Sequence, residues 1–160
     1  MSAVIRLVVA ALLVQSGGAS LLPPSHAAPK HLTLAASASA PTAAPGAKIS
    51  LFVDVTPNPG IHVYAPGAKD FLPIALTLEP LAGATPGKVI YPKSDTMTLA
   101  DEKVPVFDKP FRLTQDVAIA RSAKPGTTLT INGTIRYQAC DDAVCFVPAS
   151  APVRWTVAVK

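Results

Sequence analysis

Prolines spread along the whole chain set the strongest limit on its fold. The sequence has 160 residues, and 17 of them are proline. Each proline removes a backbone donor and clashes with the helical turn before it. Prolines at this density exclude a helix bundle or a coiled coil. Charged residues make up only 15% of the chain, which also excludes a highly charged disordered protein.

Short apolar segments with alternating polarity, separated by turn residues, predict β-strands. In the clearest example, Ile49, Leu51, Val53 and Val55 occupy every second position. No segment shows a convincing helical period. The pattern predicts an all-β fold, an antiparallel immunoglobulin-like sandwich of eight or nine short strands. The expected strands lie at residues 49–55, 62–64, 74–78, 89–91, 104–107, 111–119, 127–138 and 153–159, with a weak one at 31–35.

The pair Asn132-Gly133 has two interpretations. It is a good two-residue turn for a hairpin. It also fits a bulge within one long strand. We favour the long strand, because a turn here leaves two arms of only about five residues each.

The first 27 residues are typical of a secretory signal peptide. Arg6 precedes an apolar run at residues 7–14, and Ser25-His26-Ala27 offers a cleavage site. We expect cleavage after Ala27, with Ala19 as the second choice, and an uncleaved membrane anchor is the alternative. The apolar run is shorter than the roughly 20 residues that span a bilayer. The mature protein is therefore expected to be periplasmic, where disulfides persist, and not to span the membrane.

Two further parts are expected after the signal peptide. Residues 28–45, rich in Ala, Ser and Pro, are expected to form a flexible lead segment. Residues 46–160 are expected to form one domain. The formal net charge is +4, but the basic residues are scattered singly, so no nucleic acid is expected as a partner.

The only two cysteines, Cys140 and Cys145, carry the candidate chemistry. An even number of cysteines in an exported protein implies a disulfide. One interpretation is a structural bridge, but a loop this short contributes only about 2 kcal/mol, against about 4.7 kcal/mol for a 100-residue loop. The other is a redox-active pair at the end of a strand. A structural bridge should be buried at both sulfurs, so accessibility separates the two.

The residues around the cysteines resemble those of a known family. Residues 137–148 read YQACDDAVCFVP. This segment resembles the active-site segment of the amino-terminal periplasmic domain of DsbD, the thiol–disulfide interchange protein. Both begin with Tyr-Gln-x-Cys and continue with a short acidic loop, a second cysteine and then a proline. Weaker similarities follow the same order along the chain, at residues 60–67, 91–92 and 101–113.

The resemblance implies an immunoglobulin-like domain that takes electrons from a membrane-embedded donor and passes them to thioredoxin-like proteins. It implies that Cys145 forms the mixed disulfide and that Cys140 resolves it. It also places the acidic pair Asp101 and Glu102, and the ring of Tyr64, near the sulfurs. DsbD continues into a multi-helix membrane domain and a thioredoxin-like domain, whereas this chain stops at Lys160. We therefore expect a stand-alone domain that receives electrons from a separate membrane protein or acts on a different pathway. We also expect it to be a monomer.

Nearby carboxylates are expected to disfavour the thiolate and raise the thiol pKa. Besides the pair already named, Asp141 and Asp142 lie between the cysteines, and plain turn chemistry is an equally good reason for them. The family's aromatic residue over the disulfide is replaced here by Lys103 and Val104. Its shielding is then weaker, or comes from Phe107 or Phe146.

Two other function classes remain open. The first is a non-enzymatic sandwich with a structural disulfide, acting as a binding or scaffolding module. The second is a copper- or zinc-handling protein, in which His62 joins the two cysteines as a third ligand. His26 leaves with the signal peptide, His31 lies near the mature terminus, and a lone histidine beside Tyr64 is more often a packing residue. No cofactor or metal is therefore expected.

Overall fold

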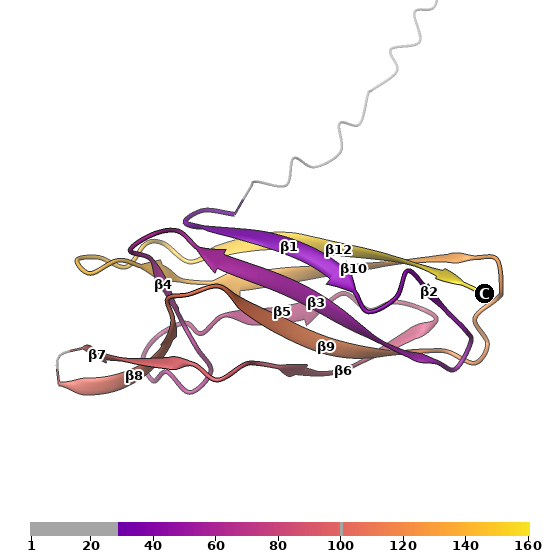
Figure 1. Cartoon of the computed structure of the whole chain (residues 1–160), viewed down its shortest axis with the longest axis horizontal. Coiled ribbons are helices and arrows are strands. Elements are labelled where there is room, and N and C mark those ends of the chain that lie inside the picture. The colour runs from indigo at the N-terminus through magenta and orange to yellow at the C-terminus, as the bar shows by residue number, and fades with distance from the viewer. Residues whose placement is uncertain (1–28, 100) are drawn as a thin grey trace, which may run out of the picture.

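The computed structural model describes residues 29–99 and 101–160, so the predicted signal peptide lies outside the described residues. Two four-stranded sheets pack face to face, and a third four-stranded sheet, made of short strands, lies at one end (Figure 1). The first sheet has the order β1 (Leu32–Ala38), β3 (Lys48–Pro57), β9 (Phe111–Ile119) and β6 (Ala84–Ile90). The second has the order β2 (Thr42–Ala43), β12 (Ala149–Val159), β10 (Thr128–Tyr137) and β5 (Ala75–Leu78). The third has the order β11 (Ala139–Cys140), β4 (His62–Tyr64), β8 (Glu102–Phe107) and β7 (Asp95–Leu99).

The all-β prediction is confirmed, and within the described residues there is no helix. All strand pairs are antiparallel except β12 with β2. The described part of the chain has twelve strands rather than eight or nine, although β2 and β11 are only two residues long. The difference is largest in the third sheet, because β7 and β11 were not predicted.

The core lies between the two large sheets and follows the predicted alternation. In β3 the residues at positions 49, 51, 53 and 55 are buried, while their neighbours are exposed or half-buried. The same period runs through β12, where Trp155 is buried and its indole Nε1 donates to the carbonyl of Phe52 at 3.1 Å. This bond joins the two sheets across the core. Each large side chain buried in this way contributes roughly 1.5–3 kcal/mol.

Residues 128–137 form one continuous strand, so the interpretation of Asn132-Gly133 as part of a long strand is confirmed. Gly133 pairs with Leu78 on one side and Val153 on the other. A Cβ atom at Gly133 would lie 2.9 Å from the Leu78 side chain and 3.2 Å from Trp155. Close packing, rather than a turn, therefore explains this glycine.

The expectation of a flexible lead segment at residues 28–45 is corrected by the structure. β1 pairs with β3 along seven residue pairs, and β2 pairs with the end of β12. Leu32 and Ala43 are buried in the main core. The segment has few bulky side chains, but backbone pairing to an exposed sheet edge does not require them. Leu32–Ala38 and Thr42–Ala43 are therefore paired into the two large sheets.

The third sheet lies at the end of the sandwich opposite the carboxyl terminus (Figure 1). Its hairpin of β7 and β8 extends from this end, and β4 links it to the short strand that holds Cys140. Among the described residues, the structure shows no helix of sufficient length and apolarity to cross a membrane.

Candidate functional site

The two cysteines form a disulfide at the edge of the third sheet. Cys140 ends β11, and the chain reverses within five residues to reach Cys145. Two backbone hydrogen bonds close this reversal: Asp141 N–H donates to the Val144 carbonyl, and Phe146 N–H donates to the Ala139 carbonyl. The loop is therefore an ordered turn that brings the two sulfurs together.

The two ends of the bridge differ in their surroundings. Cys140 is only 1% exposed and belongs to a small buried cluster with Tyr64, Val104 and Val106. Cys145 is exposed. A partner can therefore reach the bridge from the Cys145 side, whereas a bridge that serves stability alone should be buried at both sulfurs.

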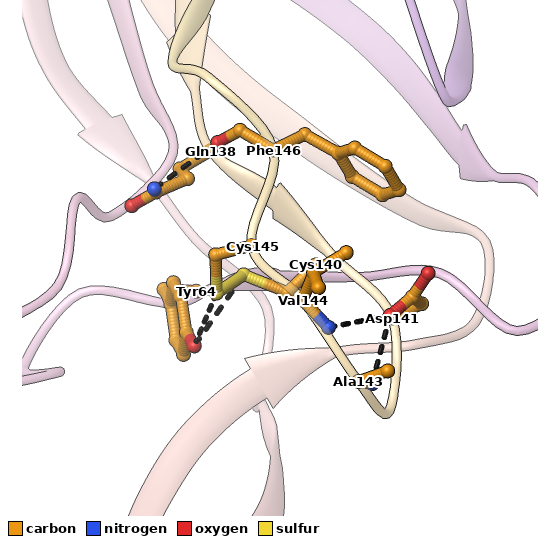
Figure 2. The surroundings of a disulfide bond; sticks show 8 residues. All are labelled: Tyr64, Gln138, Cys140, Asp141, Ala143, Val144, Cys145 and Phe146. Atoms are coloured by element: carbon orange, nitrogen blue, oxygen red, sulfur yellow. Dashed lines mark hydrogen bonds between the residues drawn. A yellow bond between two sulfur atoms is a disulfide. The ribbon is translucent and has the colours of Figure 1, made fainter.

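Tyr64 contacts both sulfurs, as the resemblance implied. Its hydroxyl lies 3.4 Å from Cys145 Sγ and 3.5 Å from Cys140 Sγ (Figure 2). In the disulfide neither sulfur carries a hydrogen, so the hydroxyl is the donor. Burial raises the pKa of Tyr64, which keeps the hydroxyl protonated. Phe71, a residue that the sequence analysis missed, stacks on this ring at 4.1 Å between centroids.

The acidic residues of the loop have separate places. One carboxylate oxygen of Asp141 accepts the N–H groups of Ala143 and Val144, both at 2.8 Å (Figure 2). These backbone bonds lower the pKa of Asp141. The turn-chemistry interpretation therefore describes what Asp141 does. Asp142 is exposed in the same loop.

The pair Asp101 and Glu102 lies at the tip of the β7–β8 hairpin, with both residues exposed. Asp101 has a positive φ of 71°, as a tight turn requires. Val106, which pairs with Tyr64, is four residues further along β8, roughly 13 Å at the usual rise of a strand. The structure thus puts this pair at the hairpin tip and leaves Asp141 and Asp142 as the acidic residues between the cysteines.

The aromatic residues named for shielding have other partners. Phe146 stacks on His31, with centroids 3.9 Å apart, and its ring points away from the sulfurs (Figure 2). Phe107 stacks on Phe111 in the main core. Instead, Tyr64 is an aromatic residue that contacts the disulfide, through its hydroxyl. Neither Phe71 nor His31 carried a sequence signal for this arrangement, because both reach the site through loop geometry.

His62 lies opposite Cys140 in the pairing of β4 with β11. It is 3% exposed, and its ring meets that of Tyr64 edge-on at 5.6 Å. Burial lowers the pKa of His62, and the charges of Asp142, Asp108 and Asp141 oppose that effect. Across residues 29–99 and 101–160, no group of three or more His, Cys, Asp or Glu side chains is arranged to hold a metal ion.

Comparison with known proteins agrees with this site. Residues 30–154 match the family model described as "Thiol:disulfide interchange protein DsbD, N-terminal". The solved amino-terminal periplasmic domain of ScsB from Proteus mirabilis has a similar fold, with a TM-score of 0.53 and 14% sequence identity over 83% of this chain; the match spans about half of that chain, 49%. The reduced amino-terminal domain of Neisseria meningitidis DsbD has a TM-score of 0.49 and 16% identity, over 85% of this chain and 90% of that one. The comparison with curated proteins found no match.

The chain is a β-sandwich with a disulfide at the end of a strand, and one of the two cysteines is exposed. Together with the matched family model, this makes it a thiol–disulfide exchange domain of reductase type. Because the matched model covers most of its length, the chain belongs to the family of amino-terminal domains of the thiol–disulfide interchange protein DsbD.

Proposed function

We propose that this domain carries reducing equivalents in the periplasm, from a separate membrane-embedded donor to thioredoxin-like proteins, through Cys140 and Cys145. The observation that carries the proposal is the unequal exposure of the two cysteines, with Cys145 exposed and Cys140 buried. Family membership supports both the chemistry and the class of partner.

The proposed reaction has two steps. In the reduced domain the Cys145 thiolate attacks the disulfide of a partner, and one partner sulfur leaves with the electron pair of the broken bond. Cys140 then gives up its proton and attacks Cys145 Sγ, which releases the second partner sulfur. The partner gains two electrons and the Cys140–Cys145 disulfide forms. The membrane donor restores the two thiols by the reverse exchange.

Residue roles follow from the same geometry. Tyr64 steadies both sulfurs, and Asp141 holds the turn between them. Asp142 is exposed in the same turn, and Phe146 follows the exposed cysteine in the chain. Asp101 and Glu102, at the exposed hairpin tip, are available to a docked partner rather than to the thiols.

The test is to trap the intermediate. Cys140→Ser should leave Cys145 able to form mixed disulfides that cannot resolve, so discrete adducts with thioredoxin-like proteins should accumulate. Cys145→Ser is the matched control and should trap none. If Cys145→Ser traps the partners instead, the proposed roles of the two cysteines are reversed.

The reduction potential separates exchange from a structural role. Exchange proteins have potentials of roughly −120 to −270 mV, whereas structural bridges lie below about −300 mV. We expect the reduction potential of the Cys140–Cys145 couple to lie in the first range. The protein is equilibrated in thiol redox buffers, and its free thiols are then counted by mass spectrometry. A value well below that range would contradict electron transfer through this pair.

A further inference from the structure

A buried histidine faces the buried cysteine. In the antiparallel pairing of β11 with β4, Cys140 is directly opposite His62, so the two side chains lie on the same face of the sheet. The Cβ atoms of directly opposed residues are about 4.5–5.5 Å apart. Tyr64, two residues further along β4, lies on that face as well and contacts both sulfurs. Three groups able to hold or move a proton therefore meet on one side of this strand pair.

The imidazole of His62 is unusual because it has a free buried nitrogen. Its Nε2 has no hydrogen-bond partner among the residues that the structure describes, although the side chain is almost fully buried. Leaving a buried polar atom unpaired costs about 1–3 kcal/mol. A phenylalanine or tyrosine ring could fill the same apolar space without this cost. Packing alone therefore does not explain why this position holds a histidine.

The resolving step supplies such a reason. Only the thiolate of Cys140 can attack the mixed disulfide, and a thiol in apolar surroundings holds its proton tightly. Cys140 lies among Tyr64, Val104 and Val106 and is 1% exposed, so solvent is a poor acceptor for that proton. The step needs a proton acceptor within the domain.

We propose that His62 is the proton acceptor for Cys140 in the resolving step, an inference that rests on the proposed exchange function. The Cys140 thiol proton passes to His62, directly or through the Tyr64 hydroxyl. The sulfur of Cys140 then bonds to Cys145 Sγ, and the bond from Cys145 to the partner breaks. The partner sulfur leaves with the electron pair and takes a proton from water, and His62 returns its proton to solvent.

The charges around His62 suit this task. Burial lowers its pKa, so the ring is neutral at neutral pH and free to accept a proton. The negative charges of Asp142 and Asp141 in the disulfide loop, and of Asp108 after β8, act in the opposite direction and favour the imidazolium that forms. The remaining titratable neighbours are Tyr64 and Cys140 themselves. The site thus holds a neutral base, and the three carboxylates offset part of the cost that burial adds to its charging.

The test follows both steps in one reaction. The reduced protein is mixed in a stopped-flow instrument with an aromatic disulfide that releases a coloured thiolate. The first release reports the attack by Cys145, and the second reports the attack by Cys140 on the mixed disulfide. We expect His62→Phe to leave the first release unchanged and to slow the second about 100-fold at neutral pH. The difference between the second-release rates of the variant and the wild type should decrease as the pH rises, because Cys140 then loses its proton to solvent without a base in the protein.

His31→Phe is the matched control, since it removes the other histidine near the loop but keeps a ring to stack on Phe146. Both releases should keep the wild-type rate in this variant. If the second release of His62→Phe also keeps the wild-type rate, His62 is a packing residue and the proposal is wrong.

If His62→Phe does not fold, a measurement on the wild-type protein tests whether His62 accepts the proton of Cys140. The protonation of His62 in the reduced wild-type protein is followed by NMR, and its midpoint is compared with the acid limb of the second-release rate. The two should coincide, and separate midpoints would overturn the proposal. If the wild-type protein releases only one coloured thiolate, the exchange function fails, which is a different result from an unchanged variant.

Discussion

At the scale of single residues, the Tyr64 hydroxyl touches both sulfurs, at 3.4 and 3.5 Å. A thiolate accepts a hydrogen bond more strongly than a thiol, so the hydroxyl should favour the ionised form of Cys145. We expect Tyr64→Phe to raise the pKa of the Cys145 thiol by roughly one unit, on the usual strength of a hydrogen bond to a charged group. Thiolate absorbance against pH measures this.

Tyr137→Phe is the control for Tyr64→Phe. The Tyr137 hydroxyl is also buried, but it donates to the Lys30 carbonyl and accepts the Lys30 N–H. Its removal should leave the thiol pKa unchanged. An equal shift in both variants would mean that the effect comes from general loosening and not from contact with sulfur.

His62 makes stability depend on pH. Burial holds its pKa below the usual 6.5, so between these two values the unfolded chain binds a proton that the folded protein does not. The free energy of unfolding should therefore fall as the pH drops below about 6.5, by at most about 1.4 kcal/mol per pH unit. Urea midpoints of the oxidised protein on either side of that pH measure the slope. His62→Phe should flatten it, and an unchanged slope would remove His62 as its cause.

At the scale of elements, the disulfide loop depends on Asp141, whose carboxylate accepts two backbone N–H groups. Asp141→Ala should loosen the turn, so that the reduced sulfurs meet less often and the bridge becomes several-fold easier to reduce. Equilibration with dithiothreitol measures this. Asp142→Ala is the matched control, since within the described residues its carboxylate makes no hydrogen bond, and it should behave as the wild type. If both substitutions made the disulfide equally easy to reduce, the effect would come from the loss of negative charge and not from the hydrogen bonds of Asp141.

Most of the sandwich could be predicted from alternation alone. The buried positions of β3, β10 and β12 are every second residue, and long β-branched runs leave little choice of structure. The bond between the two cysteines was expected from their even number and from the motif around them, and the closeness of Tyr64 to the sulfurs was expected from the weaker similarity at residues 60–67.

The elements that were missed depend on contacts that no local pattern records. β1 was expected only as a weak strand over residues 31–35, and its backbone pairing with β3 extends it to Ala38. β7 alternates Thr96 and Thr98 with Met97 and Leu99, a weak signal that only its pairing with β8 turns into a strand. The opposition of His62 and Cys140 depends on register across 78 residues of sequence, and His31 reaches Phe146 from a loop.

At the scale of the whole molecule, we propose that the folded domain begins near residue 30 rather than at residue 46. A chain that starts at residue 46 lacks β1, β2 and the buried Leu32 and Ala43. It should lose at least the roughly 2–5 kcal/mol that truncation of one buried leucine costs. Urea unfolding measures this, with a chain that starts at residue 29 as the control. Equal stability of the two chains would restore the flexible-lead interpretation.

The unequal exposure of the two cysteines also determines the order of events in a catalytic cycle. In the proposed exchange function, both the donor and the acceptor would approach Cys145, so they would occupy the same surface in succession and could not be bound together. The proposed cycle would then be a ping-pong mechanism, in which the domain stores two electrons between two separate encounters. Excess acceptor should inhibit competitively against the donor, and the domain must leave one partner before it can serve the next.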